Sequence, residues 1–257
     1  MMNYRNLSRT YILVHGAWHG GWCWRHLVPL LQAAGHTVLA PDLPGHGRDH
    51  TPLAEVTFAS YVERIASLVQ RARTPVILVG HSLGGMTISQ VAEACPGDIA
   101  CLVYLTAALP RHGQSARQLM TAQEETPALK AIDITEQGMR LKRLEEAQLL
   151  LYHDCPSADV ALAQKFLCPE PLEPLNASVT LSQRFESVPR AYLSCLDDRM
   201  IPLAVQQQMV AATPCEVVVS LPSSHSPFFS MPRRLAASLL ALAWIDEGSI
   251  GMEAQPV

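Results

Sequence analysis

The sequence predicts an α/β domain: a mainly parallel sheet of about six strands, flanked by helices, with a helical insertion after the fourth strand. Short apolar segments alternate with segments whose apolar residues recur at helical spacing, a pattern typical of parallel βαβ units. That alternation stops at Pro110 and resumes after Ser187, which marks the insertion. At 257 residues, the chain is long enough for one such domain with an insertion.

The first half of the chain supplies four strands and the helices between them. The expected strands are Tyr11–Val14, Thr37–Ala40, Val76–Val79 and Ile99–Leu105. The expected helices are Trp22–Ala34, an amphipathic segment that opens at Thr57, and Met86–Cys95. Gly35 is suited to end the first helix, because glycine accepts the left-handed conformation common there. The apolar face of the second carries Phe58, Tyr61, Val62, Ile65, Leu68 and Val69.

The second half is expected to hold the insertion, two further strands and a terminal helix. Segment 110–187 shows helical patterns, around Leu141–Leu151 and Val160–Leu167, and no convincing strand. The strand pattern resumes at Ala191–Leu196 and Glu216–Leu221, and a helix is expected over Pro232–Glu247. We therefore expect an α/β core of residues 1–109 and 188–257 and a helical cap of residues 110–187. Active-site loops should lie at the C-terminal ends of the strands.

A G-x-S-x-G pattern lies between the third expected strand and the helix that follows it. Gly80 and Gly84 flank Ser82, and this strand–turn–helix context is that of a nucleophile elbow. A tight turn brings neighbouring backbone close, so a Cβ at either glycine would clash. The turn places the Ser82 oxygen at the positive end of the next helix. Taken alone, the motif also fits a glycine-rich turn with a capping serine.

A serine hydroxyl is a weak nucleophile at neutral pH, so it needs a base and a group that orients the base. For this fold the three residues come in the order Ser, acid, His, at strand ends. Asp197 and Asp198 follow the strand that ends at Leu196, and His225 follows the next strand. The sequence therefore predicts that Ser82, an aspartate of this pair and His225 form a catalytic triad.

Backbone N–H groups are expected to hold the oxygen that becomes negative in the tetrahedral intermediate. Leu83, directly after the nucleophile, supplies one N–H. The glycine-rich loop after the first strand should supply the second; Ala17 is the candidate, and Gly16 allows close backbone approach. A phosphate cradle is the alternative for this loop, but the loop lacks the lysine of a P-loop and the G-x-G-x-x-G spacing.

Composition and charge exclude several classes of partner. A net charge of -4 and the lack of a basic run argue against nucleic acid. No apolar run approaches membrane-spanning length, and no secretory signal is visible, so we expect no membrane contact. Seven scattered cysteines without a C-x-x-C pair favour reduced thiols and a cytoplasmic location. The histidine spacing suggests no metal site, and we expect no cofactor.

Four motifs stand out along the chain: His-Gly-Ala-Trp-His-Gly-Gly-Trp, Gly-His-Ser-Leu-Gly-Gly, Asp-Asp-Arg-Met-Ile-Pro and Ser-His-Ser-Pro. Together they resemble the α/β-hydrolase superfamily, and more narrowly the plant methylesterase and hydroxynitrile lyase group with its bacterial esterases. The nearest resemblance is to bacterial pyrethroid-hydrolysing carboxylesterases, especially across Ser220–Arg234. It covers nearly the whole chain and is weakest in the cap.

The resemblance implies Ser82 as nucleophile, His225 as base, Asp198 as orienting acid, and Ala17 and Leu83 as oxyanion donors. The family places its acid four residues before the proline, which selects Asp198 over Asp197. Lyase members carry a Thr at the position of Gly16 and a Lys at that of Ser226. Cyanohydrin cleavage needs a cation near the departing cyanide, so these differences favour ester hydrolysis.

The expected activity is therefore that of a serine carboxylesterase on small-molecule, hydrophobic or bulky (pyrethroid-like) esters. A hydroxynitrile lyase and a non-catalytic ligand receptor on the same scaffold are the alternatives, and the sequence leaves a homo-oligomer open. Four residues are assigned to substrate binding: Gly16, Trp18, His81 and Phe228. Candidate pocket walls in the cap are Leu119, Met120, Leu149 and Phe166. Packing within the protein is the alternative role for the four cap residues, and also for His81.

Overall fold

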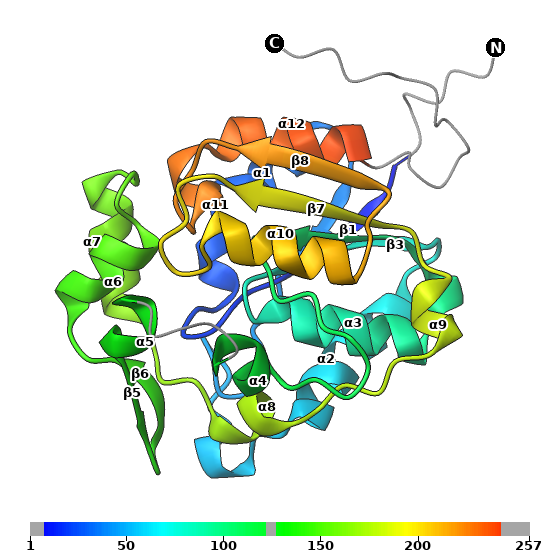
Figure 1. Ribbon diagram of the computed structural model, residues 1–257. Coiled ribbons are helices and arrows are strands. Elements are labelled where there is room, and N and C mark those ends of the chain that lie inside the picture. The colour runs from blue at the N-terminus through cyan, green and yellow to red at the C-terminus, as the bar shows by residue number, and fades with distance from the viewer. Residues whose placement is uncertain (1–7, 122–126, 243–257) are drawn as a thin grey trace.

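Six parallel strands form the centre of the molecule, in the order β2-β1-β3-β4-β7-β8 (Figure 1). The computed structural model describes residues 8–121 and 127–242. The strands are β1 (Thr10–Val14), β2 (Thr37–Leu39), β3 (Val76–His81), β4 (Ile99–Leu105), β7 (Arg190–Cys195) and β8 (Val217–Leu221). The predicted six-stranded parallel sheet is confirmed.

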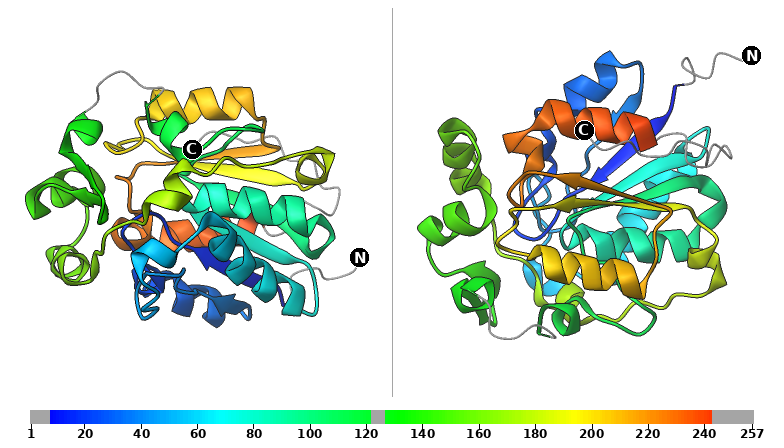
Figure 2. Two further views of the ribbon diagram at one scale, coloured as in Figure 1. Left: turned by 90° about the horizontal axis from the view of Figure 1, so that it is seen from below. Right: turned by 45° about the horizontal axis from the view of Figure 1, so that its top comes forward.

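The central strands are mostly apolar and buried along their whole length because helices cover both faces of the sheet. Every residue of β3, β4 and β7 is buried. Helices α1 (Leu27–Ala33) and α12 (Pro232–Leu242) pack together on one face (Figures 1 and 2). The other face is covered by α2 (Phe58–Arg71), α3 (Gly84–Ala94) and α10 (Leu203–Ala212).

Helix α2 begins at Phe58, and Thr57, the residue predicted to open this segment, is its N-cap. The Thr57 side chain accepts a hydrogen bond from the Ser60 N–H, and the Ser60 side chain accepts one from the Thr57 N–H. The predicted helix Trp22–Ala34 is instead a 3-10 turn (Gly21–Trp24) followed by α1. Pro29 explains the difference, since proline is tolerated in the first helical turn but not in a helix interior. Gly35 ends α1 in the left-handed conformation, with φ of 91°.

The insertion after β4 is not purely helical, so the expectation that it holds no strand is wrong. Strands β5 (Ile132–Thr135) and β6 (Gly138–Leu141) form an antiparallel hairpin. Strands of this length give too short an alternation to be recognised. Its helices are α4 (Ala116–Thr121), α5 (Pro127–Ala131), α6 (Leu144–Leu151), α7 (Ser157–Phe166), α8 (Leu172–Asn176) and α9 (Gln183–Glu186). Leu141, expected in a helix, therefore lies in β6.

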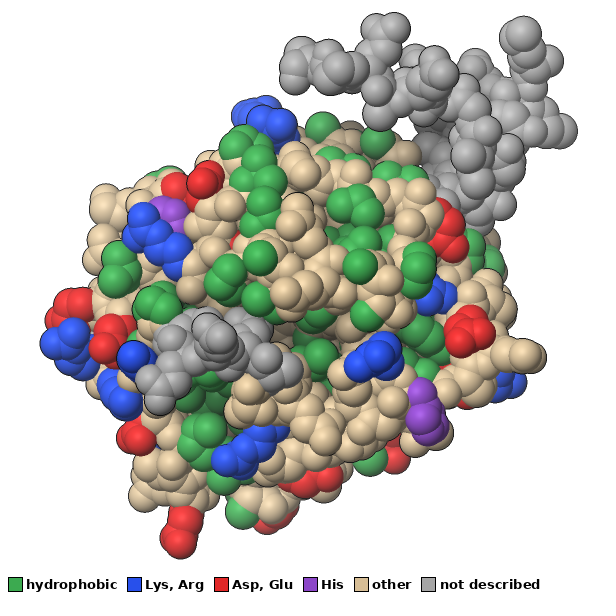
Figure 3. Space-filling model, in the orientation of Figure 1, with side chains coloured by type: hydrophobic (Ala, Val, Ile, Leu, Met, Phe, Trp, Pro, Cys, Tyr) green, Lys and Arg blue, Asp and Glu red, His purple; other side chains and the backbone are tan. Residues whose placement is uncertain are grey.

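The remaining elements are short turns and the helix after β8. They are the 3-10 turns Leu53–Glu55 and Pro96–Asp98 and the helix α11 (Pro227–Ser230). The expected terminal helix is found as α12; the part assigned to residues 243–247 lies outside the described residues. On the face drawn in Figure 3, basic and acidic side chains are interspersed. In the described ranges, no helix has both the length and the apolar character to cross a membrane.

Candidate active site

Ser82 occupies a strained turn between β3 and α3. Its φ is 51°, in the left-handed region that costs a non-glycine residue about 1–3 kcal/mol. Three backbone hydrogen bonds hold it there: the Ser82 N–H donates to Leu105 O at 3.3 Å, and Ser82 O accepts from the Ala108 N–H at 2.9 Å and the Gly85 N–H at 3.1 Å. A Cβ on Gly80 would meet the Gly84 backbone at 2.9 Å, and one on Gly84 would meet the His15 carbonyl oxygen at 2.8 Å. Both positions therefore require glycine because neighbouring backbone lies too close for a Cβ, as expected from the sequence.

Asp198 and His225 lie together at the ends of β7 and β8. The distance from His225 Nδ1 to Asp198 Oδ2 is 2.6 Å, and both side chains are buried. Because an ionised carboxylate only accepts, the imidazole donates from Nδ1 and keeps a lone pair on Nε2. Asp197 is exposed and its backbone N–H donates to Ser223 O, so it is not the partner.

His225 also lies beside the elbow. Its ring centroid is 4.6 Å from that of His81, the residue directly before Ser82. Among the described residues no hydrogen bond joins His225 Nε2 to the Ser82 hydroxyl; such bonds are often long before substrate binds. Each of the three predicted triad residues follows a strand of the parallel sheet, β3, β7 or β8, so the sheet brings them to the same end.

Three further hydrogen bonds fix Asp198. Its Oδ1 accepts from the Met200 N–H at 2.7 Å and the Ile201 N–H at 2.8 Å. Its Oδ2 accepts from Thr106 Oγ1 at 2.5 Å. Thr106, which the sequence analysis missed, is buried after β4 and has φ of 36°. Its position at a strand end was the one available signal.

The loop after β1 passes directly over Ser82. A Cβ on Gly16 would lie 2.6 Å from Ser82 Cβ, so only glycine fits without displacing a neighbour. Ala17 follows, and among the described residues its backbone N–H and that of Leu83 have no protein acceptor. Both predicted oxyanion donors are therefore free to bind a substrate oxygen.

Buried histidines hold the backbone around these donors. His15 Nδ1 is 2.9 Å from Gly16 O, and His19 Nδ1 is 2.7 Å from Ala17 O. His81 Nε2 lies 2.8 Å from His225 O. Since a carbonyl oxygen only accepts, each ring donates from the named nitrogen. Burial lowers the pKa of His19 to about 4 and lowers the pKa of His15 and His81 well below the ordinary value, so all three are neutral at pH 7.

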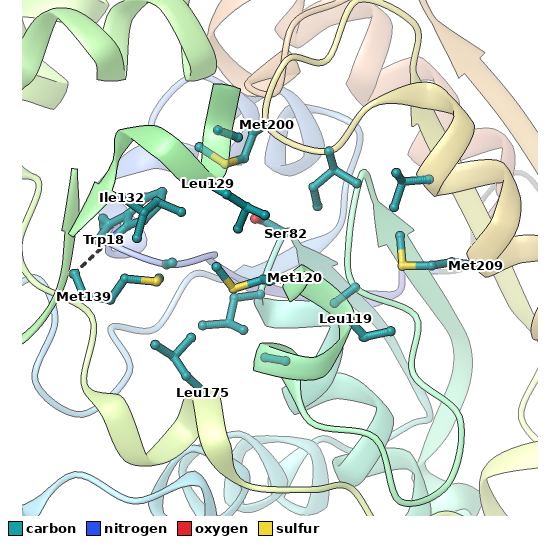
Figure 4. A pocket seen from close by; sticks show the side chains of 17 residues that line it. Trp18, Ser82, Leu119, Met120, Leu129, Ile132, Met139, Leu175, Met200 and Met209 are labelled. Carbon is teal, nitrogen blue, oxygen red and sulfur yellow. Dashed lines mark hydrogen bonds between the residues drawn. The ribbon is translucent and has the colours of Figure 1, made fainter. Parts of the chain in front are cut away.

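An apolar pocket opens beside Ser82, with about 720 Å³ of empty space including its mouth (Figure 4). Apart from Ser82 and the indole N–H of Trp18, which is bonded to Met139 O, its lining side chains are apolar. Its walls come from both the core and the insertion, and four methionines contribute: Met120, Met139, Met200 and Met209. Leu129 from α5 and Ile132 from the adjoining hairpin also line the pocket; in Figure 4, Leu129 lies near Ser82 and Ile132 near Trp18.

The structure brings some predicted substrate residues to this pocket and not others. Trp18, Leu119 and Met120 line it. Gly16 lies against Ser82, so it shapes the site through its lack of a side chain. His81 and Phe228 are fully buried behind the wall, with ring centroids 5.0 Å apart, so the structure does not support substrate contact by either.

The cap residues Leu149 and Phe166, named above as candidates for the pocket wall, do not line the pocket. Their exposed fractions are 55% and 52%, and both lie outside the pocket. Helical periodicity places a residue on a face but does not say which face covers the site. Within residues 8–121 and 127–242, no group of His, Cys, Asp and Glu side chains is arranged to hold a metal ion.

Comparisons with known proteins agree with this geometry. The model of the alpha/beta hydrolase family matches residues 11–238. A pyrethroid hydrolase of Sphingobium wenxiniae is 39% identical over 242 residues, covering 90% of this chain and 86% of that protein. Salicylic acid-binding protein 2 of Nicotiana tabacum is 36% identical, covering 92% and 97%.

Two solved structures show the same architecture. A pyrethroid hydrolase from Sphingobium faniae superposes with a TM-score of 0.82 at 35% identity, covering 94% of this chain and 99% of that chain. Polyneuridine aldehyde esterase superposes with a TM-score of 0.86 at 27% identity, covering 92% and 100%. The resemblance drawn from the sequence motifs is confirmed. The chain is thus an enzyme of the alpha/beta hydrolase family, related there to hydrolases and esterases.

Proposed function

We propose that this enzyme is a serine carboxylesterase that forms an acyl-enzyme on Ser82. The observation that carries the proposal is the His225–Asp198 pair, 2.6 Å apart and buried, beside a serine that opens into an apolar pocket. The order Ser82, Asp198, His225, after the ends of β3, β7 and β8, supports it.

In the first half of the reaction, His225 Nε2 takes the Ser82 proton as Ser82 Oγ attacks the ester carbonyl carbon. The N–H groups of Ala17 and Leu83 stabilise the negative oxygen of the tetrahedral intermediate. The carbon–oxygen bond to the alcohol then breaks, and His225 returns its proton to the leaving alkoxide. Asp198 holds the ring through Nδ1 and stabilises the imidazolium. Water, activated by His225, releases the acid by the same steps.

Hydrophobic and bulky esters are the proposed substrates. Seventeen residues line the pocket, none carries a charge, and the polar side-chain groups among them are the Ser82 hydroxyl and the Trp18 indole N–H, which is bonded to Met139 O. Burying a charged substrate group there would cost several kcal/mol, because nothing would pair with it. Methionine adapts its shape to irregular ligands, which suits bulky acyl or alcohol groups. The relative named a pyrethroid hydrolase supports esters of the pyrethroid type.

Ester turnover by the Ser82→Ala variant tests the chemistry. Loss of the nucleophile in such triads lowers kcat roughly a million-fold, so activity on p-nitrophenyl esters should vanish. An organophosphonate should label Ser82 in the wild-type protein and not in the variant, as read by intact-protein mass. Near-normal turnover by the variant would refute the proposal.

An ester panel tests the substrate class. We expect kcat/KM to rise from p-nitrophenyl acetate to longer and aromatic esters, including a pyrethroid. A preference for small charged esters would contradict the apolar pocket. Mandelonitrile belongs in the panel because a hydroxynitrile lyase was the alternative; no lysine or arginine lines the pocket, so cyanide release should stay far below ester turnover.

A reducing, cytoplasmic location is also proposed. Six cysteines carry free thiols, Cys23, Cys95, Cys155, Cys168, Cys195 and Cys215, and the first two and Cys195 are buried. Secreted proteins of this cysteine content commonly form disulfides. Fractionation of the source cells with an antibody against the protein tests the location.

A further inference from the structure

A buried polar cluster outside the triad joins the insertion to the oxyanion loop. Glu170 lies at its centre and is 1% exposed. Two core residues contact its carboxylate, His46 from the loop after β2 and Tyr61 from α2. The reaction proposed above uses none of these three side chains, yet burial of a carboxylate is costly unless it is paired.

The link to the oxyanion loop runs through Trp18, the residue after Ala17. Its backbone N–H donates to Glu170 Oε2 at 3.2 Å. Its carbonyl accepts from the Cys168 N–H at 3.0 Å, and its indole N–H donates to Met139 O at 3.0 Å, the bond drawn in Figure 4. All three polar groups of Trp18 are thus held by the insertion.

Trp18 needs such support because of its backbone. Its φ is 66°, a left-handed conformation that persists only where neighbours impose it. The conformation of Trp18 sets the direction of the peptide that precedes it, and therefore the placement of Ala17 beside Ser82. Loss of a hydrogen bond that holds Trp18 should therefore shift the Ala17 N–H, the oxyanion donor one residue away.

The Glu170 carboxylate is held firmly enough to act as that tether. Its Oε2 accepts from His46 Nε2 at 2.9 Å, and its Oε1 accepts from the Tyr61 hydroxyl at 3.1 Å. His46 Nδ1 faces Pro44 O at 3.1 Å, so both ring nitrogens face acceptors, as an imidazolium requires. Burial lowers the pKa of His46, but the charge and hydrogen bond of Glu170 and the Pro44 carbonyl outweigh it, so the pKa is raised.

We propose that Glu170 is a positioning residue for the oxyanion hole: tied by His46 and Tyr61, it fixes Trp18 and thereby aims the Ala17 N–H at the reacting carbonyl. This inference rests on the proposed esterase function. Ala17 contacts the oxygen most strongly when that oxygen carries negative charge, so the tether acts on the transition state more than on substrate binding.

The Glu170→Gln variant tests the tether. A carboxamide has an NH2 group in place of one acceptor oxygen and lacks the negative charge that faces His46, so the hold on Trp18 is weakened. Loss of a whole oxyanion donor costs about 100- to 1,000-fold in kcat, so a misplaced one should cost about 10- to 100-fold. KM should change little. The inhibition constant of a trifluoromethyl ketone, which forms an oxyanion on Ser82, should rise by the same factor as kcat/KM falls.

Glu173→Gln is the matched control. Glu173 lies three residues further along the insertion, and its Oε2 accepts from the Phe58 N–H at 2.5 Å, so it ties the insertion to α2 instead of the oxyanion loop. We expect Glu173→Gln to keep wild-type kcat and ketone affinity even if it lowers the melting temperature. Rates are expressed per site titrated with an organophosphonate, so that unfolded protein does not lower kcat.

Tyr61→Phe provides a milder variant in case Glu170→Gln does not fold. It removes one hydrogen bond to Glu170 Oε1 and should lower kcat and ketone affinity in parallel by a smaller factor. The proposal is overturned if whichever of these two variants folds keeps wild-type kcat and ketone affinity per titrated site. It is also overturned if Glu173→Gln loses activity equally. Wild-type protein that neither hydrolyses esters nor is labelled at Ser82 would refute the esterase function itself, a distinguishable result.

Discussion

Gly16→Ala is the sharpest test of the site geometry, because the added methyl group would clash with Ser82 and His81. Its ideal position is 2.6 Å from Ser82 Cβ and 3.0 Å from both His81 Nδ1 and His81 O. Carbon atoms in contact normally lie about 3.5–4.0 Å apart, so the oxyanion loop and the elbow must separate by about 1 Å. A misplacement of that size costs about 100-fold in rate. Overpacking should also lower the free energy of unfolding by about 1–3 kcal/mol.

The assay is turnover of a p-nitrophenyl ester per titrated active site, together with the melting temperature. We expect kcat to fall about 100-fold while the variant still folds. Gly97→Ala is the matched control: Gly97 has no atom within 4 Å of the position of an added Cβ, so its activity should not change. If Gly16→Ala kept kcat within about threefold of wild type, the steric argument for the oxyanion loop would be wrong.

Two further variants test the acid and a buried histidine. Thr106→Val removes the hydroxyl bound to Asp198 Oδ2 while keeping the branched shape. Because hydrogen bonds to charged groups contribute about 1.5–3 kcal/mol, kcat/KM should fall at least about tenfold. Full activity of the variant would show that Asp198 does not need this bond. The lowered pKa of His19, about 4 against 6.5, means that below pH 6.5 the unfolded chain binds a proton that the folded protein does not. His19 should therefore contribute about 3 kcal/mol to the loss of stability between pH 6.5 and 4, as measured by urea unfolding, and His15 and His81 should add to that loss. His19→Asn, which keeps a donor for Ala17 O, should flatten that dependence, and an unchanged slope would contradict it.

The sheet and the triad could be predicted because both follow from local patterns and one topological rule. Buried strands are short apolar runs, and parallel strands place their C-terminal ends together. Ser82, Asp198 and His225 each follow such a run, so the structure brings them to one end of the sheet. The glycines of the elbow were likewise predictable, since their reason is steric and lies within a few residues.

The pocket walls and the supporting contacts could not be predicted, because they depend on how the insertion packs on the core. Glu170 contacts His46 across 124 positions in the sequence, and no local pattern indicates such a pair. The hairpin that supplies Ile132 and Met139 was too short to recognise. Phe228 was expected at the pocket because it follows His225 closely, but it turns inward against Trp24.

Met139 serves two purposes at once, and this limits how the enzyme can be diversified. Its side chain forms part of the pocket wall, while its carbonyl oxygen accepts the Trp18 indole hydrogen bond. A library that varies the hairpin to admit a new ester will therefore also disturb the catalytic loop, and many of its members should lose rate before they gain a substrate. Met120 and Met209 line the same pocket without such a bond to Trp18, and mutagenesis for altered substrate range is better begun at those two positions.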